Sequence, residues 1–76
     1  MKTILESKER GFELIENDAG GLEIEVLCGG IGMFTVKVAL NQDEASLFRE
    51  NGKEFIEDRA YRIAKDPERY EQRRIS

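Results

Sequence analysis

The chain has 76 residues, with 16 acidic and 12 basic side chains, a single cysteine and no histidine. A chain of this length forms one domain, and a lone cysteine excludes an intramolecular disulfide. The lack of histidine excludes an ordinary structural zinc site, and the net charge of −4 argues against a general affinity for nucleic acid. Small domains are usually stabilised by disulfides or a structural metal, and this chain can form neither an intramolecular disulfide nor a zinc site. We therefore expect self-association to bury further apolar area.

The sequence carries no signal for a membrane. No apolar run approaches the roughly 18 residues that a spanning helix needs. The charged residues 1–6 also lack the apolar centre of a signal peptide. We therefore expect a soluble cytoplasmic protein without membrane association.

Residues 11–40 predict a β-meander. In three runs the apolar side chains alternate with polar ones, which is typical of half-buried strands. Glycine-containing loops at residues 17–21 and 28–32 separate the runs, so neighbouring strands should be antiparallel. Residues 1–10 stay ambiguous, because Thr3-Ile4-Leu5 fits an edge strand and the polar residues after it show no period. The residues expected on the core face are Phe12, Leu14, Leu22, Ile24, Val26, Cys28, Phe34, Val36, Val38 and Leu40.

Residues 41–65 predict a helix. Asn41 and Glu44 have the spacing of a capping box, which marks its start. The apolar stripe keeps its phase past Gly52, so we expect one continuous helix with Gly52 facing the sheet. The alternative is a break at Asn51-Gly52, since glycine after asparagine is also typical of a helix C-terminus. The stripe consists of Ala45, Phe48, Phe55, Ile56, Ala60 and Ile63.

Residues 66–76 predict a short basic terminal helix. Asp66-Pro67-Glu68 places a cap residue and a first-turn proline in the order that begins a helix. Its apolar residues are sparse, so we expect loose packing unless a partner binds. The whole chain is then a single α+β domain of order β-β-β-α-α. It has three strands, with a fourth possible in residues 1–10, and the long helix covers one face of the sheet.

Charge is segregated along the predicted helices. Residues 41–58 hold six acids and two bases, whereas residues 59–76 hold six bases and three acids. Acids near the start of a helix and bases near its end are stabilised by the helix dipole. This dipole effect is the simpler explanation of the segregation, and a binding function for the basic end is the other.

No residue set has the spacing of a catalytic or cofactor site. Cys28 precedes a glycine-rich loop, but a reactive thiolate needs a nearby cation or a helix N-terminus, and a strand follows the loop. We therefore expect Cys28 to be a core residue. Acid–base catalysis needs a carboxyl group whose pKa is raised by burial, whereas the clustered carboxylates lie on faces predicted to be exposed. We expect a protein that is not an enzyme and that has no cofactor or metal.

Apolar residues outside the stripe point to a partner. On a continuous helix Leu47 and Tyr61 lie opposite the stripe, and Tyr70 is the aromatic residue of the terminal helix. Tyrosine is enriched at protein interfaces. The leading hypothesis is a small non-enzymatic interaction module, expected as a homodimer, that acts through the helix exterior, the sheet edge or the basic tail.

Four arginines suggest an alternative. Arg62, Arg69, Arg73 and Arg74 lie near Tyr70 in the sequence and could contact an anion or nucleic acid. Acids lie among them, which weakens this hypothesis, because affinity for nucleic acid follows the number of phosphates neutralised. A nucleic-acid-binding accessory protein is therefore the alternative function.

Overall fold

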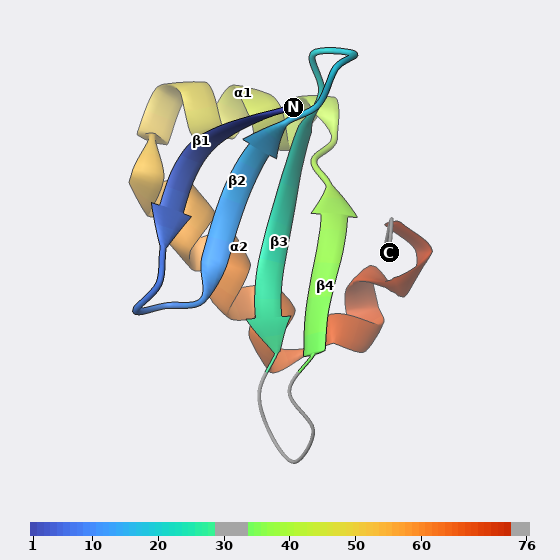
Figure 1. Cartoon of the computed structure of the whole chain (residues 1–76). Coiled ribbons are helices and arrows are strands. Elements are labelled where there is room, and N and C mark those ends of the chain that lie inside the picture. The colour runs from blue at the N-terminus through green and yellow to red at the C-terminus, as the bar shows by residue number, and fades with distance from the viewer. Residues whose placement is uncertain (29–33, 74–76) are drawn as a thin grey trace.

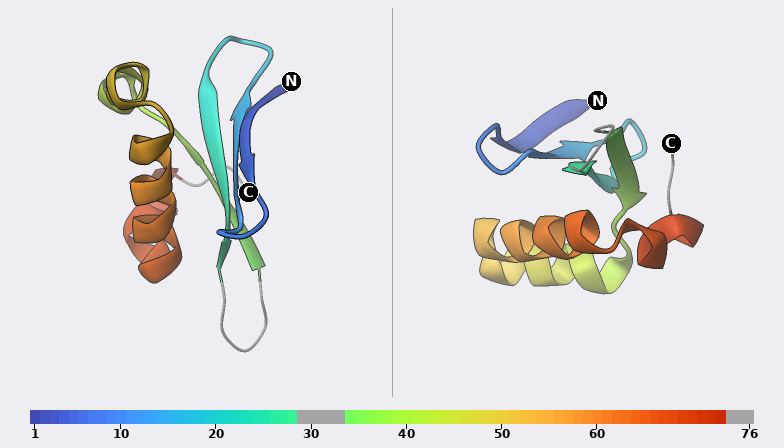
Figure 2. Two further views of the ribbon diagram at one scale, coloured as in Figure 1. Left: turned by 90° about the vertical axis from the view of Figure 1, so that its left-hand side faces the viewer. Right: turned by 90° about the horizontal axis from the view of Figure 1, so that it is seen from below.

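The protein is a four-stranded antiparallel sheet with all its helical segments on one face (Figures 1 and 2). The structure is a computed structural model that describes residues 1–28 and 34–73, with side chains as far as residue 70. The strands lie in space in their sequence order, β1-β2-β3-β4. The elements are β1 (Lys2–Ser7), β2 (Phe12–Glu16), β3 (Leu22–Cys28), β4 (Phe34–Ala39), α1 (Gln42–Asn51), α2 (Lys53–Lys65) and the 3₁₀ helix η1 (Pro67–Arg73).

The predicted α+β class and the meander with its following helices are confirmed. The ambiguous N-terminal segment is the fourth strand, β1, which pairs with β2. Its pairing shifts between Thr3 and Leu5, so the outer strand carries a bulge. Within the described residues, neither α1 nor α2 is long and apolar enough to cross a bilayer.

The hairpin between β2 and β3 is closed by Asn17. Its side-chain oxygen accepts hydrogen bonds from the backbone N–H groups of Ala19 and Gly21, at 3.0 and 2.9 Å. Gly20 has a φ of +85°, which glycine adopts without strain. The predicted turn chemistry is therefore confirmed here, whereas the glycine-rich loop predicted after Cys28 lies outside the described residues.

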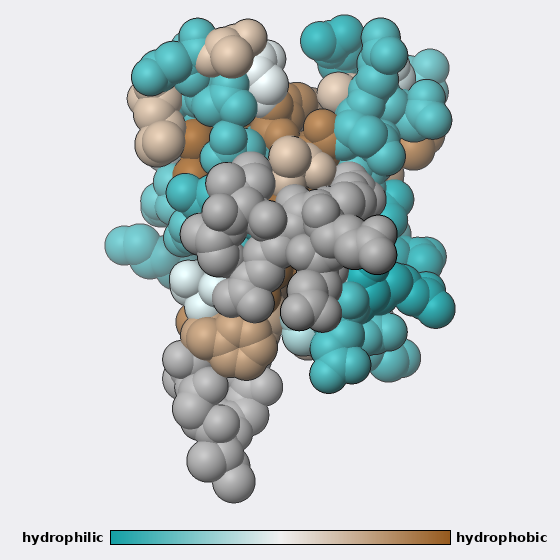
Figure 3. Space-filling view, turned by 90° about the vertical axis from the view of Figure 1, so that its right-hand side faces the viewer, coloured by the Kyte–Doolittle hydropathy of each residue, from teal (hydrophilic) through white to brown (hydrophobic). Residues whose placement is uncertain are grey.

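The core lies between the sheet and the helices. α2 packs against β2 and β3, and η1 packs against β4. Most of the residues predicted for the core face are buried, whereas Phe34 is 44 % exposed. Seen from the β4 side, hydrophobic atoms reach the surface between the two layers (Figure 3). The buried core cluster consists of Phe12, Leu14, Ile24, Val26, Cys28, Val36, Val38, Ile56, Ala60, Ile63 and Tyr70.

The expected continuous helix is wrong, because the chain turns at Gly52. This residue ends α1 and precedes α2 with φ +69° and ψ −142°, a conformation essentially restricted to glycine. Gly52 does not face the sheet, since no neighbouring atom would lie within 4 Å of an added Cβ. The turn sets α1 steeply across α2, so that α1 appears end-on where α2 runs lengthwise (Figure 2). Phe48 and Phe55 still pack on the core, which explains why the stripe kept its phase.

Candidate functional site

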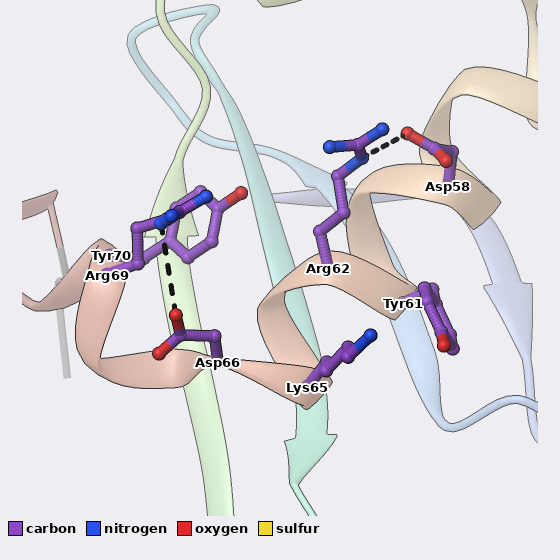
Figure 4. Close-up of a pocket in the computed structure, with 7 residues that line it drawn as sticks. All are labelled: Asp58, Tyr61, Arg62, Lys65, Asp66, Arg69 and Tyr70. Carbon is purple, nitrogen blue, oxygen red and sulfur yellow. Dashed lines mark hydrogen bonds and ion pairs between the residues drawn. The ribbon is translucent and has the colours of Figure 1, made fainter.

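A hollow of about 530 Å³ opens where α2 meets η1, and we call it the α2–η1 hollow (Figure 4). Four of its residues come from the last turns of α2, one from the connection and two from η1. Their side chains combine aromatic rings with charges of both signs. The lining residues are Asp58, Tyr61, Arg62, Lys65, Asp66, Arg69 and Tyr70.

The local sequence explains the bend that forms the hollow. α2 ends at Lys65, and Asp66 follows it with φ −145°. Pro67 then begins η1, as the cap and proline signal predicted. The N–H of Arg69 donates to the carbonyl of Asp66 at 3.3 Å, which closes the first turn of the 3₁₀ helix.

Tyr70 anchors η1 to the rest of the molecule. Its ring is only 7 % exposed and belongs to the core cluster. The prediction that the terminal helix packs loosely is therefore wrong at this residue. Because the ring is buried, Tyr70 forms a wall of the hollow and offers little surface to a partner.

A charged network behind the hollow joins three elements. The Nε atom of Arg59 on α2 lies 3.3 Å from a carboxylate oxygen of Glu44, which is 4 % exposed on α1. The Nη1 atom of the same arginine donates to the hydroxyl of Tyr70 at 3.3 Å. Its guanidinium also lies 5.2 Å from the ring centroid of Phe55. Through Arg59, therefore, α1 and η1 are both tied to α2.

Glu44 has a second role in this network. Its side chain accepts a hydrogen bond from the N–H of Asn41 at 3.0 Å, and Asn41 accepts from the N–H of Glu44 at 2.8 Å. The predicted capping box is thus confirmed. One carboxylate both caps α1 and pairs with Arg59, so the start of α1 and the wall of the hollow depend on the same side chain.

The charges that line the hollow are partly paired with one another. Arg62 contacts Asp58 at 2.8 Å, and Arg69 lies 3.8 Å from Asp66. The hydrogen bond and charge of Asp58 raise the pKa of Arg62 above its ordinary value. Among the described residues, Lys65 lies within ion-pair distance of no carboxylate. Its ammonium lies 5.8 Å from the ring centroid of Tyr61.

Tyr61 is the most accessible ring in the hollow. It is 63 % exposed, so most of its surface faces solvent in the free protein. A large ring with a polar hydroxyl contributes contact area at a low entropic cost. The hollow can therefore bind through apolar contact at Tyr61 and through its surrounding charges.

Among the described residues, no group of three or more His, Cys, Asp and Glu side chains could hold a metal ion. Cys28 is buried in the core cluster, as predicted, and does not line the hollow. What the hollow brings together is one exposed ring and several charges, which suits binding.

Seven residues were predicted from the sequence to contact a protein, an anion or a nucleic acid, and four of them lie together in the structure. Tyr61, Tyr70, Arg62 and Arg69 all line the hollow. Leu47 is 39 % exposed on α1 and does not line it. Leu47 and Tyr61 are both exposed as expected, but they do not share one helix face, because α1 and α2 are separate helices. The predicted contacts of Arg73 and Arg74 lie outside the described side chains.

Sequence reasoning missed Asp58, Lys65 and Asp66 in the hollow. Two of them had a usable signal, because Asp58 precedes Arg62 by four residues and Lys65 follows Tyr61 by four, so each pair shares a helix face. Asp66 had been assigned only to capping. Its contribution to the hollow depends on the bend between α2 and η1.

Comparison with known proteins found no match: no family model fits the chain, and no curated protein or solved structure was similar to it. The function of the α2–η1 hollow must therefore be argued from the residues of this chain. The exposed ring of Tyr61 and the charges beside it are the features from which that argument starts.

Proposed function

We propose that the protein is a small non-enzymatic interaction module that self-associates, with the α2–η1 hollow as its main contact surface. The observation that carries the proposal is the exposure of Tyr61, at 63 %, beside the ammonium of Lys65 and the guanidinium of Arg62. Tyrosine and arginine are the residue types most enriched among strong contributors to protein binding. A second chain that covers Tyr61 would remove this ring from water.

Self-association would also stabilise a chain that is too short to bury a large core. A domain of 76 residues buries only about 60 % of the surface that its unfolded chain exposes. Here neither a disulfide nor a zinc site is available to add stability. Burial of further apolar surface between copies is the remaining source, because it stabilises the folded state by mass action.

A protein partner fits the hollow better than a polyanion does. Arg62 and Arg69 each lie beside a carboxylate within the hollow, and only Lys65 lacks such a neighbour among the lining residues. A nucleic acid gains affinity by neutralising phosphates, and the acids of the hollow oppose that gain. The mixed charges suit a protein surface, where pairs of both signs set orientation.

Sedimentation velocity of the purified protein tests this proposal. We expect the wild type to associate as its concentration rises, and Tyr61→Ser to shift that association to concentrations about tenfold or more higher. Lys53→Ser, at an exposed site on the first turn of α2, is the matched control and should behave as the wild type. If Tyr61→Ser associates as the wild type does, the hollow is not the contact surface.

Leu47 is a second residue proposed for the contact surface, with a smaller expected contribution to association. It is an exposed apolar residue on α1, and Leu47→Ser should weaken association less than Tyr61→Ser does. Circular dichroism should show both variants folded, because both side chains are exposed. An unchanged sedimentation profile for Leu47→Ser would remove α1 from the contact surface.

The nucleic-acid alternative has its own measurement. Fluorescence anisotropy with a labelled single-stranded RNA, titrated at low and physiological salt, should show no specific binding. Binding that weakens steeply with salt and disappears in Arg62→Gln/Arg69→Gln would favour the alternative function.

A further inference from the structure

The outer face of the sheet is the second unusual surface of the molecule. All described helical segments lie behind the sheet, and no described element covers the face turned toward the viewer in Figure 1. One row of cross-strand neighbours on this face runs from β1 to β4. In order, its members are Glu6, Glu13, Glu25 and Lys37.

Three neighbouring positions in this row are acidic, and we call Glu6, Glu13 and Glu25 the acidic row. Directly opposite side chains in an antiparallel pair lie about 5 Å apart at Cβ, and like charges there are destabilising. Two contacts partly compensate the row, because the ammonium of Lys37 lies 3.8 Å from Glu25 and the hydroxyl of Thr3 donates to Glu13 at 2.8 Å. Glu6 and Glu13 still lie directly opposite each other on β1 and β2, an arrangement that a cationic surface would stabilise.

Beside the acidic row lies a second hollow, of about 360 Å³, which we call the sheet hollow. All three glutamates line it, together with Leu27, Thr35 and one base, Lys8. Leu27 is 38 % exposed, and its Cβ would lie 3.2 Å from a Cβ added at Gly11. Glycine at position 11 thus leaves room for Leu27 to form an apolar patch next to the carboxylates.

The α2–η1 hollow offers the complementary features. It presents the exposed ring of Tyr61 with three bases, Arg62, Lys65 and Arg69, and two acids, Asp58 and Asp66. Charge along the sequence is divided in the same sense, since residues 59–76 carry six bases and three acids and residues 1–58 carry six bases and thirteen acids. An apolar group with an excess of bases on one surface therefore matches an apolar group with an excess of acids on the other.

The two hollows belong to opposite layers of the molecule. The α2–η1 hollow is lined from the end of α2 and from η1, whereas the sheet hollow is lined from the strands and the β1–β2 connection. The helices and the sheet form opposite layers (Figure 2). One copy cannot bring its own two surfaces together across the core. A contact between these unlike surfaces is heterologous, so each copy that docks leaves one surface free for the next.

We propose that the occupant of the sheet hollow is a second copy of this chain, which docks its α2–η1 hollow there. This inference rests on the proposed function and deepens it by naming the surface that the α2–η1 hollow meets. Tyr61 of one copy covers Leu27 of the next, and Arg62 and Lys65 face the acidic row. Association is head-to-tail and weakens with salt, because its ion pairs form between exposed charges.

A mixing experiment tests the proposal. Glu13→Gln/Glu25→Gln impairs the sheet hollow alone, and Tyr61→Ser/Lys65→Gln impairs the α2–η1 hollow alone. By sedimentation velocity each variant should associate at least about tenfold more weakly than the wild type. Mixed in equal amounts, the two should form a 1:1 complex that grows no further, because each supplies the surface that the other lacks. Glu50→Gln/Glu54→Gln, at exposed acids outside the row, is the matched control and should associate as the wild type.

The outcomes separate this inference from the function on which it rests. If the wild type associates, the Tyr61 variant does not, and the Glu13 variant associates as the wild type does, the proposed function stands and the inference is overturned. A mixture that stays monomeric also overturns the inference. A wild type that is monomeric at every concentration removes both. Thermal unfolding should show the Glu13 variant folded, because neither substituted side chain belongs to the core cluster.

Discussion

On the inner face of the sheet Leu14, Ile24 and Val36 are fully buried beneath the helices, whereas on the outer face Glu6 and Glu13 stand side by side with no described element above them. Both faces follow the same alternation along the strands. A solvent-exposed face needs only polar side chains, and acids paired with bases would be more stable there than neighbouring glutamates. The inner face therefore stabilises the fold, and the acidic row on the outer face is the surface on which the proposed docking depends.

The largest expected effect is on the inner face. Leu14→Ala should lower the free energy of unfolding by about 2–5 kcal/mol, because it opens a cavity where the side chain is fully buried. Leu27→Ala on the outer face should lower it by less than about 1 kcal/mol. Urea unfolding followed by circular dichroism measures both.

Leu14→Ala could leave the chain unfolded at every urea concentration. In that event Ile24→Val, at another fully buried site, should give a measurable loss of about 1 kcal/mol. Equal losses for Leu14→Ala and Leu27→Ala would contradict the assignment of stability to one face.

Gly52 determines how the helices cover the inner face of the sheet, since the chain turns there and α2 then packs against β2 and β3. Gly52→Ala should destabilise the protein by about 1–3 kcal/mol, because an L-residue is strained at φ +69°. A synthetic chain with D-alanine at this position should keep wild-type stability, since D-residues favour positive φ and the site has room for a Cβ. An increase in stability with L-alanine would instead indicate the continuous helix predicted from the sequence.

The two tyrosines of the α2–η1 hollow should respond differently to loss of their hydroxyl groups. Tyr70→Phe removes the acceptor for Arg59 and should cost about 1 kcal/mol while the ring stays in the core. Tyr61→Phe, at an exposed ring, should change the free energy of unfolding by less than about 0.5 kcal/mol. Chemical unfolding of the two variants under identical conditions makes the comparison, and the reverse order would show that Tyr70 is not the anchor of η1.

The smallest expected effect is a gain on the outer face. At a concentration where the protein is monomeric, Glu6→Gln should raise the free energy of unfolding by up to about 1 kcal/mol, because it removes a charge directly opposite Glu13. The gain should shrink as salt is added, because salt screens the repulsion between exposed carboxylates. Glu50→Gln should show a smaller gain, and a loss of stability in Glu6→Gln would mean that the acidic row is not repulsive.

Much of the fold followed from short-range patterns in the sequence. The alternation in β3 and β4 placed Ile24 and Val36 in the core, and the spacing of Asn41 and Glu44 predicted the start of α1. The break between α1 and α2 at Gly52 was harder to predict, because the apolar stripe keeps its phase across this residue. Two helices that each turn an apolar side toward one core produce the same stripe as a single helix.

The candidate site was predictable only in part. The exposure of Tyr61 and the basic residues near it followed from helical periodicity. The link of Glu44 to Tyr70 through Arg59 joins residues 15 and 11 positions apart, and no local pattern predicts such contacts. The acidic row could not be predicted from the sequence either, because it depends on the register of three strands.

The most direct test of the account is sedimentation equilibrium of the wild-type protein over a wide range of concentrations, at low and at high salt. The account predicts a mass that rises with concentration beyond that of a dimer at low salt and falls back toward 8.7 kDa at high salt. A mass of 8.7 kDa at every concentration and salt would contradict it.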